Sequence, residues 1–204
     1  MSKNPIIVFE GIEGSGKSLH INNVSNYLKK INRKFIRIRE PGGTNNSEKI
    51  RKLILNNKSS FNRNTDLLLY MSARSENISL IKKNYKKKII LIDRFVDSTI
   101  AYQHYGLDVD IKIINFINKF LLKDIKVTFT FLNLVNSKNM VERLKKRIKL
   151  NRYDKFSITF YNKVQKGFLN ISKKRNNKYL KVNSNLEINF NKKIIINKVK
   201  ELII

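Results

Sequence analysis

The stretch IIVFEGIEGSGKS, residues 6–18, decides the fold. It begins with an apolar run that is typical of a strand buried on both faces of a sheet. Three glycines follow within six positions, in a chain that has only seven. Residues 11–18 fit the pattern G-x-x-x-x-G-K-[ST], and residues 19–31 continue with helical spacing. A strand, a glycine loop and a helix in this order predict a loop that wraps phosphate groups.

Each part of this loop has an expected role. Backbone N–H groups in the loop and at the helix N-terminus should face an anion. Lys17 is expected to reach the β and γ phosphates of a nucleoside triphosphate, and the Ser18 hydroxyl to bind Mg²⁺. A flexible turn before a helix is the alternative, but such a turn needs neither the lysine nor the spacing. The predicted ATP-binding residues are Gly11, Gly14, Ser15, Gly16, Lys17 and Ser18.

Further β-branched runs alternate with stretches of helical spacing. The expected strands are 6–10, 34–39, 88–93, 126–134 and 178–182, and the expected helices are 19–31, 65–85, 111–122, 137–148 and 158–175, with a last helix in 191–204. Alternating strands and helices require crossover connections. The sequence therefore predicts one α/β domain, 1–204, with a five-stranded, mostly parallel sheet covered by helices on both faces.

Composition excludes several classes of protein. There is no cysteine, and the chain has two histidines, so disulfides, thiolate zinc sites and a histidine metal cluster are not expected. No apolar run approaches the roughly 20 residues of a membrane span. The first strand begins almost at once, which leaves no space for a leader peptide, so we expect a cytoplasmic protein.

The net charge of +28 has two interpretations. It is typical of a nucleic-acid-binding protein. However, Lys, Asn and Ile are enriched together, as A/T-rich codons would produce without selection for binding, and the basic residues are scattered rather than gathered in a block. We therefore expect no nucleic-acid partner, although a basic nucleic-acid-binding protein with a phosphate loop remains an alternative.

In parallel sheets, chemistry collects beyond the carboxyl ends of the strands. Arg39 ends the second expected strand and is followed by a turn at Gly42-Gly43, which suits the binding of an acceptor molecule. Asp93 ends the third, where it can join the Mg²⁺ shell, and Arg94 can clamp a phosphate. A local surface ion pair is the alternative for Asp93 and Arg94.

Four motifs in this order, FEGIEGSGKS, REPGGT, YMSAR and DRFVDSTIAYQ, resemble those of bacterial thymidylate kinases, which belong to the P-loop nucleoside-monophosphate kinase group. The resemblance covers essentially the whole chain. It implies transfer of the ATP γ-phosphoryl group to dTMP with Mg²⁺, and a homodimer for which the stretches 65–85 and 111–122 are available. Another nucleotide or deoxynucleoside kinase is the alternative within this class.

The resemblance also assigns roles residue by residue. Arg39 and Arg94 match the residues that grip the dTMP phosphate, Asp93 the carboxylate beside the metal, and Glu13 the carboxylate near the 3′-hydroxyl. Tyr70 matches the aromatic ring that stacks on thymine, and Arg74 matches the arginine that contacts the thymine base. The strip that reads the base edge and the sugar matches Ser98, Thr99, Tyr102 and Gln103, with Tyr102 crowding out a ribose 2′-hydroxyl.

Some members of the family carry an arginine in the phosphate loop, and others supply arginines from a mobile lid. The loop here has none, whereas 142–155 contains Arg143, Arg147 and Arg152. We therefore expect a short mobile lid at 142–155, with Arg147 and Arg152 covering the γ phosphate. A solvated basic helix face is the alternative. Ile148 and Asn151 stand where the family usually has Gly and Asp, so the lid departs from the family pattern at its hinge and at its closing contacts.

Overall fold

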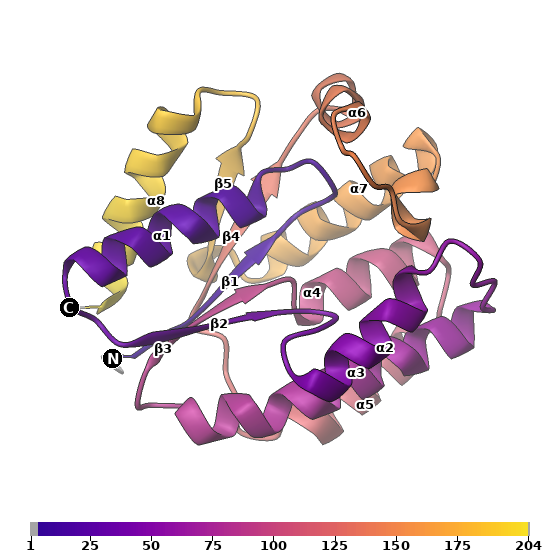
Figure 1. Ribbon diagram of the computed structural model, residues 1–204, viewed down its shortest axis with the longest axis horizontal. Helices are drawn as coiled ribbons and strands as arrows, with labels where there is room; N and C mark the ends of the chain where they lie inside the picture. Colours follow the sequence, from indigo (N-terminus) through magenta and orange to yellow (C-terminus); the bar gives the residue numbers. More distant parts are fainter. Residues whose placement is uncertain (1–3, 204) are drawn as a thin grey trace.

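A computed structural model describes residues 4–203 of the chain. A five-stranded sheet with the strand order β2-β3-β1-β4-β5 lies between two layers of helices (Figure 1). Each neighbouring pair of strands in the described residues is parallel, which confirms the predicted α/β architecture. The strands are β1 (Ile6–Glu10), β2 (Phe35–Arg39), β3 (Ile89–Asp93), β4 (Phe129–Leu134) and β5 (Tyr179–Asn183).

The central strand β1 is buried along its whole length, as its apolar sequence predicts. Ile7 and Phe9 face helices α1 (Lys17–Lys30) and α8 (Ile188–Ile203), where they meet Val24 and Ile195 in one apolar cluster. These two helices lie side by side over one face of the sheet (Figure 1). The burial of β1 on both faces fixes its carboxyl end, and with it the start of the glycine loop.

The opposite face of the sheet is covered by a larger set of helices. Ile6 and Val8 of β1 point to this side, where Ile78 and Ile81 pack against the sheet. The helices are α3 (Arg63–Asn84), α4 (Val96–Thr99), the π-helix η1 (Ile100–Gly106), α5 (Ile111–Leu122) and α7 (Ile158–Lys174), with α2 (Asn45–Leu55) packed on α3. A π-helix is rare and often marks a functional site.

Three short elements complete the chain. Helix α6 (Ser137–Lys145) follows β4, the 3₁₀ helix η2 (Arg152–Lys155) lies over the ends of α2 and α3, and the 3₁₀ helix η3 (Asn176–Lys178) precedes β5. In Figure 1 the connection from α6 to α7 passes above α2. The expected lid, 142–155, therefore spans the gap between α6 and α2.

Several expected boundaries were wrong. The helix expected at 137–148 ends at Lys145, because Leu144 is its last buried side chain and Ile148 is fully exposed. The strand expected at 126–134 begins at Phe129, because Ile6 donates its N–H to the Thr128 hydroxyl (3.1 Å) rather than to a backbone carbonyl. Helix α2 was not predicted at all. Within residues 4–203, no helix is both long and apolar enough to cross a membrane.

Candidate active site

The glycine loop joins β1 to α1 and needs glycine for steric reasons. Gly11 has φ of 139°, and a Cβ on it would stand 2.3 Å from the Asn133 carbonyl oxygen. Gly16 caps the N-terminus of α1 in the left-handed conformation, at φ of 84°. Only glycine adopts both conformations without strain. The loop therefore presents its backbone and the N-terminus of α1 to the space above the sheet, which is a suitable site for an anion.

Lys17 is folded back under this loop. Its Nζ donates hydrogen bonds to the carbonyl oxygens of Gly11 (3.0 Å) and Ile12 (2.8 Å). Burial, followed by repulsion from Arg94, lowers the pKa of Lys17 to about 8. The lysine thus carries its positive charge at neutral pH in a partly dehydrated position, where an added phosphate would be attracted strongly.

Ser18 and Asp93 meet across two strand ends. The Ser18 hydroxyl donates to Asp93 Oδ2 at 3.0 Å, and Asp93 lies in register with Phe9 of β1 and Arg39 of β2. The two side chains together supply a hydroxyl and a carboxylate, which are the hard oxygen ligands that Mg²⁺ prefers. A Mg²⁺ ion at a phosphoryl-transfer site takes few protein ligands and completes its shell with substrate phosphates and water, so this small donor set fits.

Arg94 follows Asp93 and turns back toward the loop, with φ of 64°. Its guanidinium pairs with Glu13 Oε1 (2.7 Å), donates to the Gly11 carbonyl (2.9 Å) and stacks over the Tyr102 ring (5.0 Å). Burial raises the pKa of Glu13, but the charges of Arg94 and Lys17 outweigh it, so the net shift is downward. The Tyr102 hydroxyl also donates a hydrogen bond to Glu13 Oε2. These contacts hold one acid and one cation in fixed positions beside the phosphate loop.

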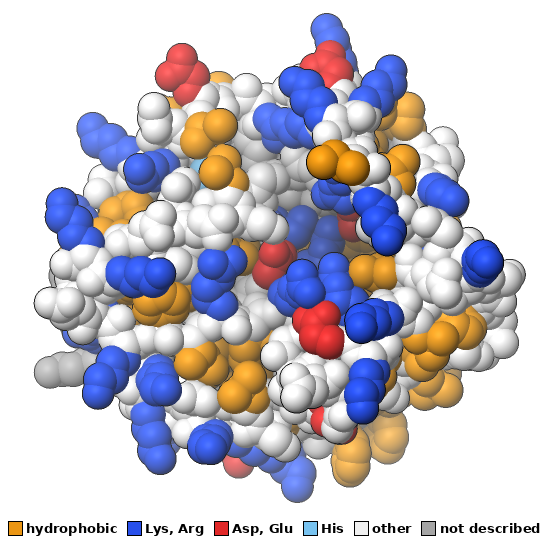
Figure 2. Space-filling view, viewed as in Figure 1, with side chains coloured by type: hydrophobic (Ala, Val, Ile, Leu, Met, Phe, Trp, Pro, Cys, Tyr) orange, Lys and Arg blue, Asp and Glu red, His pale blue; other side chains and the backbone are white. Residues whose placement is uncertain are grey.

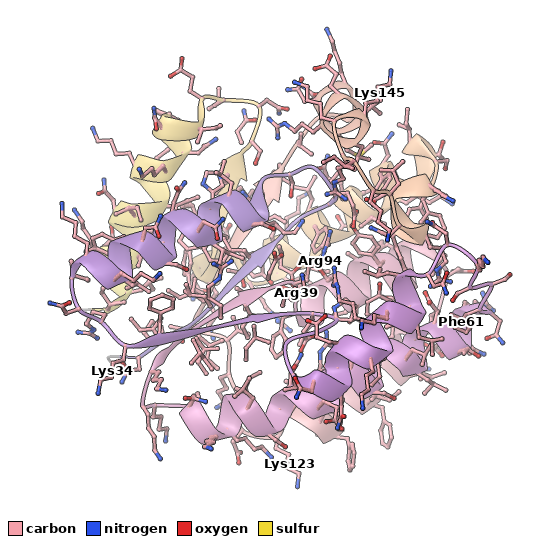
Figure 3. The ribbon with its side chains drawn as sticks, in the orientation of Figure 1. Lys34, Arg39, Phe61, Arg94, Lys123 and Lys145 are labelled. Carbon is pink, nitrogen blue, oxygen red and sulfur yellow. The ribbon has the colours of Figure 1, made fainter. Side chains whose placement is uncertain are left out.

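Arg39 reaches the same space from the end of β2. Its guanidinium makes a two-pronged contact with Glu48 of α2, with an Nη2–Oε2 distance of 3.0 Å. The Arg39 side chain is 55% exposed, so this ion pair is open to competition from another anion. Figure 3 shows Arg39 and Arg94 at the centre of the molecule, both on the side where the strands end.

Arg74 of α3 is buried and lines the same space as Arg39 and Arg94. It is 2% exposed and directs its donors to Glu40 Oε2 (2.8 Å), Asn118 Oδ1 (2.7 Å) and Thr99 Oγ1 (2.9 Å). Burial raises the pKa of Glu40, and the positive charge of Arg74 acts against that shift. A buried arginine with matched acceptors is held rigidly, so it can offer a fixed hydrogen-bonding edge to a ligand.

Aromatic rings and amides form one wall of this space. The rings of Tyr70 and Tyr153 meet edge to face at 5.8 Å, and Tyr102 is tilted against Tyr153 at 5.9 Å. Gln103 donates its amide to the Tyr153 hydroxyl at 3.3 Å. Tyr102 and Gln103 both come from the π-helix, so this unusual element positions part of the wall. Flat rings with polar edges suit a planar heterocycle.

Most of these groups line one cavity of about 540 Å³. From the loop, Glu13, Lys17 and Ser18 belong to the lining, whereas the predicted ATP-binding residues Gly11, Gly14, Ser15 and Gly16 do not, in the part of the chain that the structure describes. Figure 2 shows it as a hollow near the centre of the face, with basic and acidic side chains gathered in it. The sequence-predicted residues that line the cavity are Glu13, Lys17, Ser18, Arg39, Tyr70, Arg74, Asp93, Arg94, Ser98, Thr99, Tyr102, Gln103 and Arg147. The side chains of Lys17, Arg39, Asp93 and Arg94, which come from three separate loops, therefore share one space.

The candidate lid arginines differ in position. Arg147 lines the cavity and pairs with Asp154 (2.5 Å). Arg152 pairs with Asp66 of α3 and donates to the Ile54 carbonyl (3.1 Å), outside the cavity lining. Arg143 donates to the Gly14 carbonyl (2.9 Å), behind the phosphate loop. The structure thus brings Arg147 to the cavity, whereas Arg152 lies outside the cavity lining, bound to Asp66 and to the end of α2.

Sequence reasoning missed several residues at the cavity. Glu48 and Arg51 come from α2, and Asn151 and Tyr153 come from the lid segment. A signal for α2 was present, because the Thr44 hydroxyl accepts from the N–H of Ser47 as a helix N-cap, and apolar residues follow at helical spacing. Tyr153 had no comparable signal, since only the folded chain brings it beside Tyr70.

A parallel sheet with this loop at the end of β1, and arginines from two other strand ends in the same cavity as Lys17, is typical of P-loop kinases that act on a small phosphorylated acceptor. Comparisons with known proteins narrow the class. A sequence model of the family described as thymidylate kinase matches residues 9–195. The chain belongs to the thymidylate kinase family.

Individual relatives agree with this assignment. The chain is 38% identical over 176 residues to a thymidylate kinase of Thermosipho africanus, covering 85% of this chain and 87% of that protein. It is 35% identical over 198 residues to one from a Sulfurihydrogenibium species, covering 96% of each chain. The crystal structure of thymidylate kinase from Ehrlichia chaffeensis superimposes with a TM-score of 0.77 at 31% identity, covering 97% of this chain and 98% of that one.

Proposed function

We propose that this protein transfers the γ-phosphoryl group of ATP to dTMP, giving dTDP and ADP on the route to dTTP. One observation carries the proposal. Lys17 and Ser18 at the end of the glycine loop, two arginines from other strand ends and an aromatic wall line a single cavity. Two anionic substrates can therefore meet end to end, and the cavity of about 540 Å³ accommodates the acceptor nucleotide.

The donor half consists of the glycine loop, Lys17, Ser18 and Asp93. ATP phosphates lie along the loop, and Lys17 exchanges its carbonyl partners for phosphate oxygens. Ser18 and Asp93 are the residues that would hold Mg²⁺, and Mg²⁺ neutralises charge on the ATP phosphates when it is bound. The existing 3.0 Å contact between Ser18 and Asp93 supports their action as a pair.

The acceptor half consists of the two arginines and the wall. Arg94 and Arg39 grip the dTMP phosphate, because planar guanidinium groups match phosphate oxygens. Thymine stacks on Tyr70 and meets Arg74 and the neighbouring amide of Gln103. The remaining contacts to the base edge and the sugar come from Glu13, Ser98, Thr99 and Tyr102. The Tyr102–Glu13 hydrogen bond supports a closed sugar pocket with no room for a ribose 2′-hydroxyl.

Catalysis depends on alignment and charge. The acceptor phosphate is already ionised at neutral pH, so the reaction needs no general base. Residues 142–155 act as the lid, and Arg147, which lines the cavity, stabilises charge on the transferred group. Arg152 can contribute directly only after it leaves Asp66, so we assign it to the closed state.

We also propose a cytoplasmic homodimer. Helix α5 exposes Phe116 (74% exposed) and Phe120 (68%), with Ile113 one turn away. Leu68 is exposed on the neighbouring helix α3 (56%). Such a row of large apolar side chains is typical of an interface. A second copy of this chain across α3 and α5 would cover these side chains.

An acceptor panel tests the function. Purified protein with ATP and Mg²⁺ is offered dTMP, dUMP, dCMP, dAMP and thymidine, and ADP release is followed. A clear preference for dTMP supports the proposal, whereas preference for any other acceptor overturns the substrate assignment. Failure with every acceptor, together with nanomolar DNA or RNA binding that survives 200 mM salt, would favour a nucleic-acid-binding protein, since purely electrostatic binding weakens steeply with salt.

A further inference from the structure

A second cavity, of about 380 Å³, lies beside α5 on the face of the sheet that α3, α5 and α7 cover. It shares only Phe95 with the lining of the catalytic cavity, as far as residues 4–203 show. In Figure 3 Lys123, on its rim, projects from the lower edge of the molecule, whereas Arg39 and Arg94 lie at the centre. Its apolar lining comes from Val8, Val96, Ile100, Leu122, Ile125 and Val127. The proposed reaction makes no use of this space.

The mouth of this second cavity is strongly basic. Five exposed cations surround it: Lys119, Lys123, Lys126, Arg175 and Lys178. The two carboxylates in its lining already have partners. Glu10 is fully buried and accepts from the N–H groups of Phe95 (2.8 Å) and Ser98 (3.2 Å). Asp97 accepts from the Tyr179 hydroxyl and pairs with Arg175 at 3.9 Å, so the four lysines are the cations that a ligand meets first. The remaining field at the mouth is positive, which favours an anionic ligand.

Asn118 supplies an unused donor in the wall. This residue is 5% exposed, and its Oδ1 accepts a hydrogen bond from Arg74 at 2.7 Å. Because arginine can only donate, the amide oxygen must face Arg74 and the NH₂ group must face the other way. That Nδ2 has no hydrogen-bond partner within residues 4–203, and Asn118 lines the second cavity. Buried donors are almost always paired, with protein, water or ligand, and an acceptor atom of a ligand in this cavity is one partner that can satisfy Asn118.

We propose that this cavity binds a small amphipathic anion. An acceptor atom of the ligand takes the hydrogen bond from Asn118, its apolar body packs on the aliphatic lining, and its carboxylate, sulfonate or phosphate lies at the cationic rim. Asn118 stands between the two cavities, because its oxygen holds Arg74, which lines the catalytic cavity. Occupancy of the second cavity therefore changes the affinity of the catalytic cavity for dTMP. Only this coupling rests on the proposed function.

Fluorescence titration with 1-anilinonaphthalene-8-sulfonate, an apolar body with one sulfonate, tests the site. Asn115 is exposed on α5 at the cavity mouth, so Asn115→Trp blocks the mouth without disturbing the core. Asn197→Trp, on an exposed position of α8, is the matched control. We expect saturable binding that Asn115→Trp weakens at least tenfold and Asn197→Trp leaves within twofold. Equal binding by the two variants, or no saturable binding by the unmodified protein, would overturn the proposal.

Two double variants that share the same net charge test the rim. Lys119→Glu with Lys123→Glu should weaken probe binding at least tenfold, whereas Lys192→Glu with Lys193→Glu, on exposed positions of α8, should change it less than twofold. Loss of binding in Phe116→Ser but not in Asn115→Trp would place the probe on the apolar face of α5 that carries Phe116 and overturn the proposal. Displacement of the probe by dTMP in direct competition would do the same.

The coupling has its own readout. In the unmodified protein, saturating probe should shift the KM for dTMP at least twofold, and the shift should vanish in Asn115→Trp while the KM without probe stays unchanged. An unaltered KM with the probe bound would refute the coupling and leave the binding site standing. Failure to phosphorylate dTMP at all would instead refute the proposed function, because probe binding is measured without substrate.

Discussion

Replacement of Arg94 by alanine separates the chemistry of this site from its stability. In the protein, Arg94 pairs with Glu13 at 2.7 Å, and the two side chains are only 17% and 11% exposed. Removal of one partner from a buried ion pair leaves the other charge uncompensated, which costs about 3–5 kcal/mol. Because both side chains retain some contact with solvent, we take the lower end. Arg94→Ala should therefore lower the free energy of unfolding by about 3 kcal/mol, or roughly 6–12 °C in Tm.

The catalytic cost has a different origin. Arg94 is expected to hold the dTMP phosphate and to stabilise charge in the transition state, and loss of one such group typically reduces turnover at least about a hundredfold, equivalent to about 2.7 kcal/mol. Neutralising Glu13 in the same protein, as Arg94→Ala with Glu13→Gln, removes the unpaired charge. The free energy of unfolding of this double variant should exceed that of Arg94→Ala by at least about 1 kcal/mol. Turnover should not recover.

Thermal unfolding and a steady-state assay with dTMP measure the two effects on the same samples. Glu13→Gln alone is the control for the loss of its hydrogen bond from Tyr102. Turnover of Arg94→Ala within tenfold of the unmodified enzyme would refute the assignment of Arg94 to the reaction. An unchanged Tm of Arg94→Ala would refute the claim that loss of Arg94 leaves the charge of Glu13 buried and unpaired.

Three further predictions concern the lysine and the lid. The pKa of Lys17 is about 8 in the free enzyme, and only its charged form attracts phosphates. We therefore expect kcat/KM for ATP to fall as the pH rises through about 8. A profile that stays flat to pH 9.5 would contradict this. Arg152→Ala should chiefly lower kcat, and an effect on KM alone would argue against its place over the transferred phosphate. Asp66→Ala removes the acceptor shared by Arg152 and Tyr153 and should lower the unfolding free energy by about 3 kcal/mol in a denaturant titration, whereas stability within 0.5 kcal/mol would show that the contact is dispensable.

The sequence could predict the parts of the site that follow from strand ends. An apolar strand, a glycine loop and Lys17 are adjacent in the chain, and Asp93 and Arg94 follow another apolar strand. Because neighbouring parallel strands end at one edge, these residues had to come together once the strand order was set. The parallel register of β1, β2 and β3 brings Arg39 to the same edge.

Contacts between distant helices could not be predicted in this way. The resemblance predicts that Arg39 grips the dTMP phosphate, but nothing in the sequence indicated that α2 would bring Glu48 against it. Arg152 was grouped with Arg147 because both lie in one basic segment, yet Asp66, a residue 86 positions away, holds Arg152 at the wall. Such pairings depend on how α2, α3 and η2 pack together, and no local pattern of charge or hydrophobicity encodes that packing.

A crystal structure with dTMP, Mg²⁺ and a non-hydrolysable ATP analogue would show whether the two anionic substrates meet end to end in the one cavity. We expect Arg39 to leave Glu48 and to join Arg94 on the dTMP phosphate, with thymine against Tyr70 and the triphosphate along residues 11–18. A dTMP phosphate bound away from both arginines, or a triphosphate that does not contact Lys17, would contradict it.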